Sequence, residues 1–448
     1  MRIDLDQPLA WEQANQPEQA MLNDLQGNIV KSHGRNHAAH VFLHFEDPPK
    51  ARQFVRALGH ELTCALRQLN DTKEFKKTRT SAGQFLAFLL SAAGYDALEI
   101  DSSKIPSGAA FRTGMKQRGA DLADSPPITW DKHFQQACHA MVLIADDSAP
   151  NVRRDLRRLR RKIERHVGVS EIGVEIGKVI RNEYGRATEH FGYVDGISVP
   201  VMLREDLPES PEHWSPTAPL GQALVQDPGG GSATSFGSYV VFRKLEQHVP
   251  AFKQAEEQLA HLLGLEGSDE ERAGAMLIGR FEDGTPLVLS KEDGLSPEAP
   301  VNDFSYAGDP LGRRCPMHAH IRKVNPRGES VTQQPPFSED EHAERAHMIV
   351  RRGITYDAGL LFIAYQSSIE DQFEFIQRHW VNNPGFVTSS AGLDPIIGQQ
   401  ASAPYQWPIL WGEEAAPIAA PFGIGSFITL KGGEYFFAPC ISFLTSLP

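Results

Sequence analysis

One short segment concentrates side chains that can bind a metal or a cofactor. The segment RRCPMHAHIRKVNPRG, Arg313 to Gly328, contains one cysteine, two histidines at H-x-H spacing and four further Lys/Arg side chains beyond Arg313. Imidazole and thiolate are ligands that zinc, copper and haem iron accept. The segment is therefore either an anchor for a metal or cofactor or a polar loop, and at this point both interpretations stay open.

Two other segments place charged residues where they could do chemistry. In FGYVDGISVP, Phe191 to Pro200, Asp195 precedes Gly196, and a turn in which the aspartate caps its own backbone is the simpler interpretation of that fragment alone. In AHMIVRRGITYD, Ala346 to Asp357, the apolar start of a strand is interrupted by Arg351 and Arg352. Strand alternation predicts that one arginine faces solvent and the other points inward, where it needs an anionic partner or ligand.

A histidine, an aspartate and an arginine are together what a haem peroxidase requires. Such an enzyme needs a neutral imidazole on the iron, a base that moves the proton of H2O2 and a cation that stabilises the departing oxygen. His320, Asp195 and Arg351 supply one of each. This combination indicates a peroxidase without proving one.

The amino-acid composition limits which other partners, locations and metal sites are possible. The 448 residues are enough for two domains, and the net charge of −13 argues against nucleic acid or an anionic membrane as the partner. No export signal is visible at the start, and the apolar runs are too short to cross a membrane. The four cysteines lack C-x-x-C spacing, which disfavours zinc ribbons and c-type haem and favours a cytoplasmic location.

These residues must be positioned by strands and helices. Strands are expected at 39–45, 139–147, 171–181, 238–249 and 359–366, and helices at about 50–69, after Ser148, and at 250–265 and 368–383. The helix after Ser148 places Leu156, Leu159, Ile163 and Val167 on one face. Its eight Lys/Arg are either a patch for a polyanion or, as we favour, a solvated face.

A Pro- and Ser-rich stretch at 207–235 places the domain boundary there, giving residues 1–225 and 226–448.

Six segments resemble those of the dye-decolorizing peroxidases, in the same order along the chain. They are FGYVDGISVP, AHIRKVNPR, IVRRGITY, LQGNIVKSHGR, GLLFIAYQSSIEDQFEFIQRHWVNN and FITLKGGEYFFAPCIS. The resemblance implies an α+β fold of two ferredoxin-like domains, each an antiparallel β-sheet packed with helices, with haem in the C-terminal domain. It implies one non-covalent haem b per chain and the one-electron oxidation of dyes and aromatic or phenolic donors by H2O2, through an oxo-ferryl intermediate.

The resemblance also assigns the central residues. His320 matches the axial ligand of the haem iron, Asp195 the distal acid–base residue and Arg351 the distal cation. A carboxylate base works at lower pH than a histidine, so an activity optimum at about pH 3 to 5.5 is expected. The alternative is a protein that binds or transports haem, or releases its iron, without turnover.

Further residues follow from the same resemblance. Arg327 matches a residue that pairs with a haem propionate, a role suited to a guanidinium fork, and Leu360 and Phe362 match the apolar wall of the distal pocket. Asp394 is the candidate for the carboxylate that hydrogen-bonds the second nitrogen of His320. His318 is expected to be no ligand, either facing a propionate or exposed.

Some positions stay open or depart from the family pattern. Cys315 is expected to pack rather than bind metal, although a non-haem site of Cys315, His318 and His320 is a further alternative. Val199 and Gly353 stand where relatives commonly have polar residues. Large dyes that cannot enter the haem pocket could be oxidised at the surface by electron transfer through Trp380, Tyr356 or Tyr193, although a role as a core aromatic is favoured for each. A monomer and a homodimer both remain possible.

Overall fold

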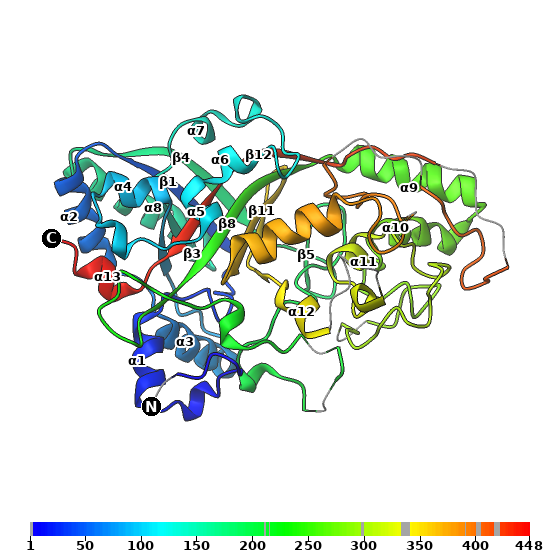
Figure 1. The fold of residues 1–448 in the computed structure, drawn as a ribbon, viewed down its shortest axis with the longest axis horizontal. Helices are drawn as coiled ribbons and strands as arrows, with labels where there is room; N and C mark the ends of the chain where they lie inside the picture. Colours follow the sequence, from blue (N-terminus) through cyan, green and yellow to red (C-terminus); the bar gives the residue numbers. More distant parts are fainter. Residues whose placement is uncertain are drawn as a thin grey trace.

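One continuous antiparallel sheet of ten strands forms the centre of the protein, and its main path consists of two four-stranded sheets with the same strand order, joined edge to edge (Figure 1). The structure is a computed structural model and describes residues 3–209, 212–214, 216–296, 300–332, 341–389, 391–399, 405–415 and 422–448. The first sheet has the order β4-β1-β3-β2 and the second β12-β8-β11-β10. When the four strands of each sheet are numbered by their order in the chain, they lie side by side in the spatial order 4-1-3-2, which is the ferredoxin-like arrangement. The predicted fold class is confirmed.

The elements have the following bounds. The strands of the first sheet are β1 (His37–Phe45), β2 (Phe85–Leu90), β3 (Ala140–Asp146) and β4 (Val169–Lys178), and those of the second are β8 (Phe236–Gln247), β10 (Ile354–Tyr356), β11 (Gly359–Gln366) and β12 (Ile428–Ala438). Short strands are β5 (Ile180–Arg181), β6 (Ala187–Thr188), β7 (Val225–Gln226) and β9 (Val350–Arg351). The helices are α1 (Gln16–Asp24), α2 (Pro48–Gly59), α3 (Ala65–Thr78), α4 (Ala92–Ala97), α5 (Ala109–Thr113), α6 (Met115–Arg118), α7 (Lys132–Gln135), α8 (Ala149–Arg165), α9 (Val249–Leu263), α10 (Glu271–Ile278), α11 (His320–Val324), α12 (Glu341–Ala346) and α13 (Ile441–Thr445).

The two sheets meet along both of their outer edges. On one side β2 pairs with β12 through Leu90 and Phe437. On the other side the Thr355 hydroxyl of β10 donates to the Lys178 carbonyl of β4. There Gly177 allows the approach, because a Cβ at this position would lie 2.5 Å from Ile354 Cγ2. The strands therefore surround a common core.

The prediction of a single helix at 50–69 is wrong, because this part of the chain forms two helices, α2 and α3. Asp47 caps α2, and the Cys64 sulfur accepts from the Arg67 amide at the start of α3. Between the two helices the Thr63 amide donates to the Leu86 carbonyl at 2.9 Å, so the chain turns onto β2. The helix expected at 368–383 is present over 369–381, where it consists of the π-helical segments Ile369–Glu374 and Ile376–Val381 joined at Phe375.

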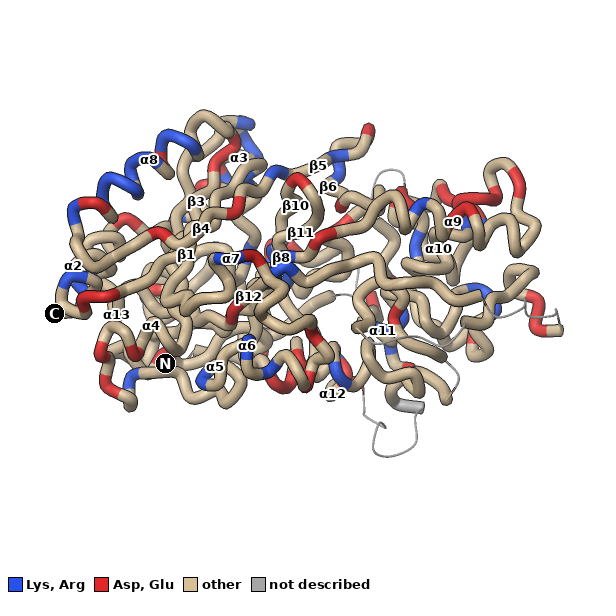
Figure 2. The backbone as a smooth tube through the Cα atoms, turned by 90° about the horizontal axis from the view of Figure 1, so that it is seen from above, with Lys and Arg blue, Asp and Glu red and all other residues tan. Residues whose placement is uncertain are grey.

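The basic helix α8 lies on the outside of the molecule, where Figure 2 shows Lys and Arg along its length. Leu156, Leu159 and Ile163 are buried, whereas Val167 lies beyond the helix end and is 79% exposed, so its predicted place in the core is wrong. Ser148 occupies the N-cap position without a side-chain capping bond. Four of the basic residues are paired with carboxylates: Arg154 and Arg158 with Asp155, Arg160 with Glu171, and Lys162 with Glu61.

Beyond the sheets, α9, α10 and α11 form a lobe on the right of Figure 1. The chain enters this lobe after the stretch at 207–235, of which residues 210, 211 and 215 lie outside the described part. The boundary between residues 225 and 226 remains a prediction. Within the described part of the chain, every helix is too short or too polar to cross a membrane.

Candidate haem and peroxide site

A cavity of about 280 Å³ lies where the second sheet meets the lobe. Its lining comes from the loop after β6, from α10 and α11, from the end of β9 and from β11. Seven of the residues singled out in the sequence line it: Asp195, His320, Arg327, Arg351, Leu360, Phe362 and the relay candidate Tyr193. Asp394 lies directly behind His320.

His320 is the first residue of α11, and its ring is held by a buried carboxylate. Its Nδ1 lies 2.8 Å from Asp394 Oδ2, and the Asp394 side chain is fully buried. Oδ1 of this aspartate accepts from the amides of Ile396 at 2.8 Å and Ile397 at 3.0 Å. Burial opposes the charge of Asp394, but His320 and the two amides outweigh it, so its pKa is lowered. Nε2 of His320 makes no hydrogen bond to a described residue and is left for the cavity.

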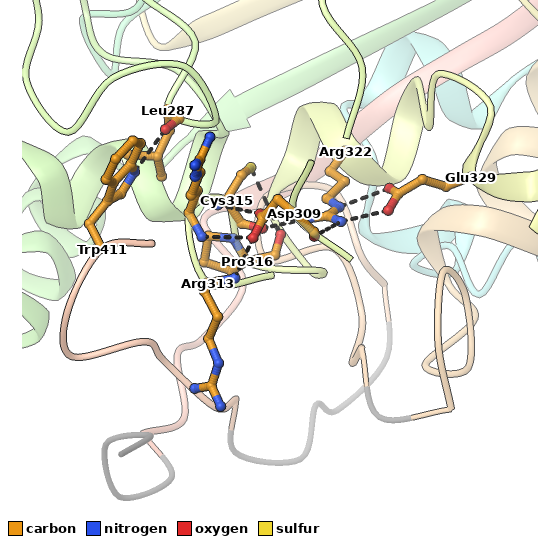
Figure 3. Close-up of polar contacts among 9 residues, drawn as sticks. Leu287, Asp309, Arg313, Cys315, Pro316, Arg322, Glu329 and Trp411 are labelled. Carbon is orange, nitrogen blue, oxygen red and sulfur yellow. Dashed lines mark hydrogen bonds and ion pairs between the residues drawn. The ribbon is translucent and has the colours of Figure 1, made fainter. Parts of the chain in front are cut away.

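Two buried cations fix the helix that carries His320. The Arg322 guanidinium donates to both oxygens of Glu329, at 2.8 and 2.5 Å, and to Asp309 Oδ2 at 3.0 Å (Figure 3). The Lys323 ammonium donates to the carbonyls of Asn383 at 2.7 Å and Gly392 at 2.9 Å, and to a third carbonyl. The partners of these two cations could not be predicted from the sequence, because they lie up to 69 positions away.

Asp195 is both a turn residue and a member of an ion pair. Its Oδ1 accepts from the Gly196 amide at 2.6 Å and from Arg351 Nη1 at 3.0 Å, and Gly196 has a φ of 86°. Its Oδ2 has no hydrogen-bond partner among the described residues. Arg351 Nη2 also donates to the Ile197 carbonyl at 3.1 Å, so the arginine holds the loop as well as the carboxylate.

The neighbouring arginine does not face solvent as the alternation predicted. Arg352 Nε donates to the Asn28 carbonyl at 3.0 Å, and Nη2 donates to the Ile29 carbonyl at 3.2 Å. Burial lowers the pKa of Arg352 to about 10. The short strand β9 ends at Arg351, so strict alternation no longer applies to the next residue.

Strand alternation does hold for the apolar wall of the cavity. Leu360 and Phe362 of β11 line the cavity, whereas Leu361 and Ile363 point to the opposite face and are buried in the core. Residues two apart share one face of a strand. The spacing of these residues in the sequence therefore indicates which of them line the cavity and which face the core.

A pair of buried guanidinium groups gives the cavity a cationic end. Arg280 Nη2 and Arg327 Nη2 both donate to Asn302 Oδ1, at 3.2 and 2.7 Å, and Arg327 also donates to the hydroxyl of Ser198 at 3.2 Å. Neither arginine forms an ion pair with a carboxylate among the described residues. Burial and the nearby Arg327 lower the pKa of Arg280 to about 10. Two buried cations without an anion fit a dianionic ligand.

Glu189 is a second carboxyl group in the cavity wall, which our sequence analysis did not identify. It accepts from the amides of Phe191 at 2.8 Å and Tyr193 at 3.1 Å, and from the Gln247 side chain. Burial raises the pKa of Glu189 to about 7. No local sequence signal marks it, because its burial depends on β8.

His318 and Cys315, from the segment 313–328, are buried and do not line the cavity. His318 is not in a strand and is not exposed: its ring packs 4.5 Å from the ring of Tyr405 and 4.5 Å from that of Trp407, and burial lowers its pKa to about 3. Burial raises the pKa of Cys315 to about 12. The described residues contain no group of three His, Cys, Asp or Glu that could hold a metal ion, which argues against a non-haem site of Cys315, His318 and His320.

The three relay candidates differ in exposure. Trp380 and Tyr193 are 4% and 5% exposed, and the Tyr193 hydroxyl donates to Glu256 at 2.7 Å. Tyr356 is half-buried, and the Lys244 ammonium lies 5.0 Å from its ring centre. A Cβ added at Gly353 would lie 3.0 Å from the Leu361 carbonyl oxygen, so this position leaves little space for a side chain.

Comparison with known proteins defines the class of the chain. Residues 24–179 match the family described as the DyP dimeric alpha+beta barrel domain, and residues 215–390 match the C-terminal part of Dyp-type peroxidases. The chain belongs to the Dyp-type, or dye-decolorizing, peroxidase family, and the prediction of this enzyme class is confirmed.

Individual relatives are similar over the full length. The chain is 42% identical to the multifunctional dye peroxidase DyP2 of Amycolatopsis sp., covering 100% of both chains, and the solved structure of that protein matches with a TM-score of 0.93. The DyP-type peroxidase of Anabaena sp. has a TM-score of 0.90 at 37% identity, over 99% of both chains. The dye-decolorizing peroxidase msp1 of Mycetinis scorodonius is 28% identical, over 97% of this chain and 89% of its own.

Proposed function

We propose that the protein is a haem b peroxidase whose cavity holds one non-covalent haem between His320 and the Asp195–Arg351 pair. The observation that carries this proposal is the single free imidazole nitrogen facing a cavity that also contains a carboxylate, a guanidinium and an apolar wall. When bound, the haem would supply the iron that accepts two oxidising equivalents from H2O2 and passes them to donors one electron at a time.

The residues of the cavity fit such a group. His320 would be the protein ligand of the iron, and Asp394 would keep its Nδ1 protonated so that Nε2 carries the lone pair. Arg327, together with Arg280, would pair with the propionates, because these two buried cations form no ion pair with a described carboxylate. Leu360 and Phe362 would cover the apolar ring and exclude water.

Asp195 is placed to move the proton of H2O2. Its Oδ1 is occupied by Arg351 and Gly196, so Oδ2 would accept the proton from one peroxide oxygen and return it to the other, which leaves as water. Arg351 holds the carboxylate in position through their 3.0 Å contact and stabilises negative charge on the departing oxygen. H2O2 and aromatic or dye donors are therefore the proposed substrates.

A spectroscopic experiment tests this proposal. The purified protein, reconstituted with haem, should give a Soret band that shifts after one equivalent of H2O2 and returns on addition of a phenolic donor. Asp195→Ala and Arg351→Ala should bind haem but lose peroxide-dependent turnover. If haem binds tightly while both the wild type and these variants fail to oxidise a donor, the protein is a haem carrier and the proposal is wrong.

A further inference from the structure

A second cavity lies behind the loop that carries Asp195. Its volume is about 490 Å³, and it is bounded by residues 30–35, by α3 and by the segment 199–206. Gly196, the residue after Asp195, lines both cavities, and Arg352, the residue after Arg351, lines the second one. The two cavities are therefore separated by the loop that carries Asp195.

The second cavity has an excess of positive charge. Arg35 donates only to carbonyls, those of Gly83 at 2.9 Å and His33 at 3.1 Å, and Arg352 likewise bonds only to carbonyls among the described residues. The two carboxylates in its wall already have partners: Asp206 pairs with Lys31, and Asp147 accepts from Asn36 and Ser81.

The wall therefore carries three cations, Lys31, Arg35 and Arg352, against two carboxylates, Asp147 and Asp206, in a protein whose net charge is −13. The ring of His33 adds no charge, since burial lowers its pKa to about 3. A cationic pocket of this kind attracts a small anion, because opposite charges interact strongly where the dielectric constant is low.

Part of the remaining wall is apolar and includes an exposed aromatic ring. Phe75 is 37% exposed on α3, although its neighbours Glu74, Lys76 and Lys77 are charged. Val199 and Met202 contribute further apolar surface to the same cavity. An exposed ring beside aliphatic side chains favours the flat face of another aromatic group.

We propose that this second cavity binds a phenol carrying a carboxylate or sulfonate, with its ring at Phe75 and its anionic group near Arg35 and Arg352, and that this phenol is a reducing substrate. The donor role rests on the proposed peroxidase function. Two phenols each lose one electron and the hydroxyl proton to give phenoxyl radicals, and the two electrons and two protons convert H2O2 into two waters. The donor thus reacts from behind the loop that carries Asp195, without entering the haem cavity.

Direct binding of 4-hydroxybenzoate tests the site without peroxide. Calorimetry at pH 7 on the full-length haem-loaded protein should show saturable binding, with at least tenfold weaker binding of the neutral 4-hydroxybenzyl alcohol. Phe75→Glu should weaken 4-hydroxybenzoate binding about tenfold, because it removes the ring and adds a negative charge. Phe75→Leu should retain binding within about threefold. Leu262→Glu, at a position 39% exposed on α9, is the matched control and should bind like the wild type.

The outcomes separate this inference from the proposed function. Equal binding by the Phe75→Glu and wild-type proteins, or equal affinity for the anionic and neutral phenols, would overturn the site. Lost binding in Phe75→Glu, with an unchanged circular dichroism spectrum and a raised KM for 4-hydroxybenzoate oxidation, would support it. Binding that responds to Phe75→Glu in a protein without peroxidase activity would leave the site standing and refute the proposed function.

Discussion

Replacing Asp394 with asparagine tests how the proposed iron ligand is held. The asparagine side-chain oxygen can still accept from the amides of Ile396 and Ile397, so the loop should keep its shape. Its NH2 group, however, would face His320 Nδ1, where the carboxylate now accepts at 2.8 Å. Nδ1 would then have to be the acceptor, and the proton would move to Nε2, the atom proposed to bind iron.

The magnitude follows from the hydrogen bond that is lost. A hydrogen bond to a charged group contributes about 1.5–3 kcal/mol, and 1.4 kcal/mol is a factor of ten, so haem affinity should fall about 10- to 100-fold. Titration of haem into the apoprotein, followed by the Soret band, measures this change. The control is Asp227→Asn, since Asp227 is also a buried carboxylate that accepts from two amides, those of Gly229 and Cys440, outside the cavity.

The control should lose stability without losing haem affinity. Equal haem affinity and an identical ferric spectrum in Asp394→Asn and the wild type would show that this carboxylate does not set the tautomer of His320. The proposed role of the His320–Asp394 pair would then be wrong, although the fold would be unaffected.

Three further predictions concern the same region. Asp195→Asn should lower kcat/KM for H2O2 by about 10²- to 10⁴-fold while haem binding persists; a loss below threefold in stopped-flow measurements would exclude Asp195 as the base. Burial raises the pKa of Glu189 from 4.5 to about 7, so between these pH values the folded state keeps a proton that the unfolded state has lost. The free energy of unfolding should therefore fall by about 3 kcal/mol as pH rises through this range. Glu189→Gln should flatten that slope in urea unfolding at pH 5, 6 and 7, and an unchanged slope would contradict the assignment. Trp380 is stacked on Phe386 at 5.3 Å, so Trp380→Phe should cost about 1–2 kcal/mol of stability and leave the turnover of a bulky dye unchanged; a selective loss of dye oxidation would instead identify it as a relay.

The strands and the principal cavity residues could be predicted because their signals are local. The alternation of Leu360 and Phe362 with Leu361 and Ile363 is visible in the sequence, and the same alternation orients them in β11. The break at Thr63 could not be predicted, because it depends on a hydrogen bond to Leu86 in another element.

The electrostatic partners of the cavity could not be predicted for a related reason. Arg280 and Arg327 are 47 positions apart and meet only through Asn302, and Glu189 is buried by Gln247 from β8. Side chains of this kind become neighbours only when the tertiary structure forms. Sequence motifs identified the residues of the cavity but not the charges that surround them.

The way in which the two sheets meet also has a consequence for solubility. Each outer strand of one sheet lies against an outer strand of the other, through Leu90 and Phe437 on one side and through Lys178 and Thr355 on the other. Exposed strand edges are where other chains add and where fibrils start. The intact protein covers these edges, whereas either half expressed alone would present two of them and should aggregate.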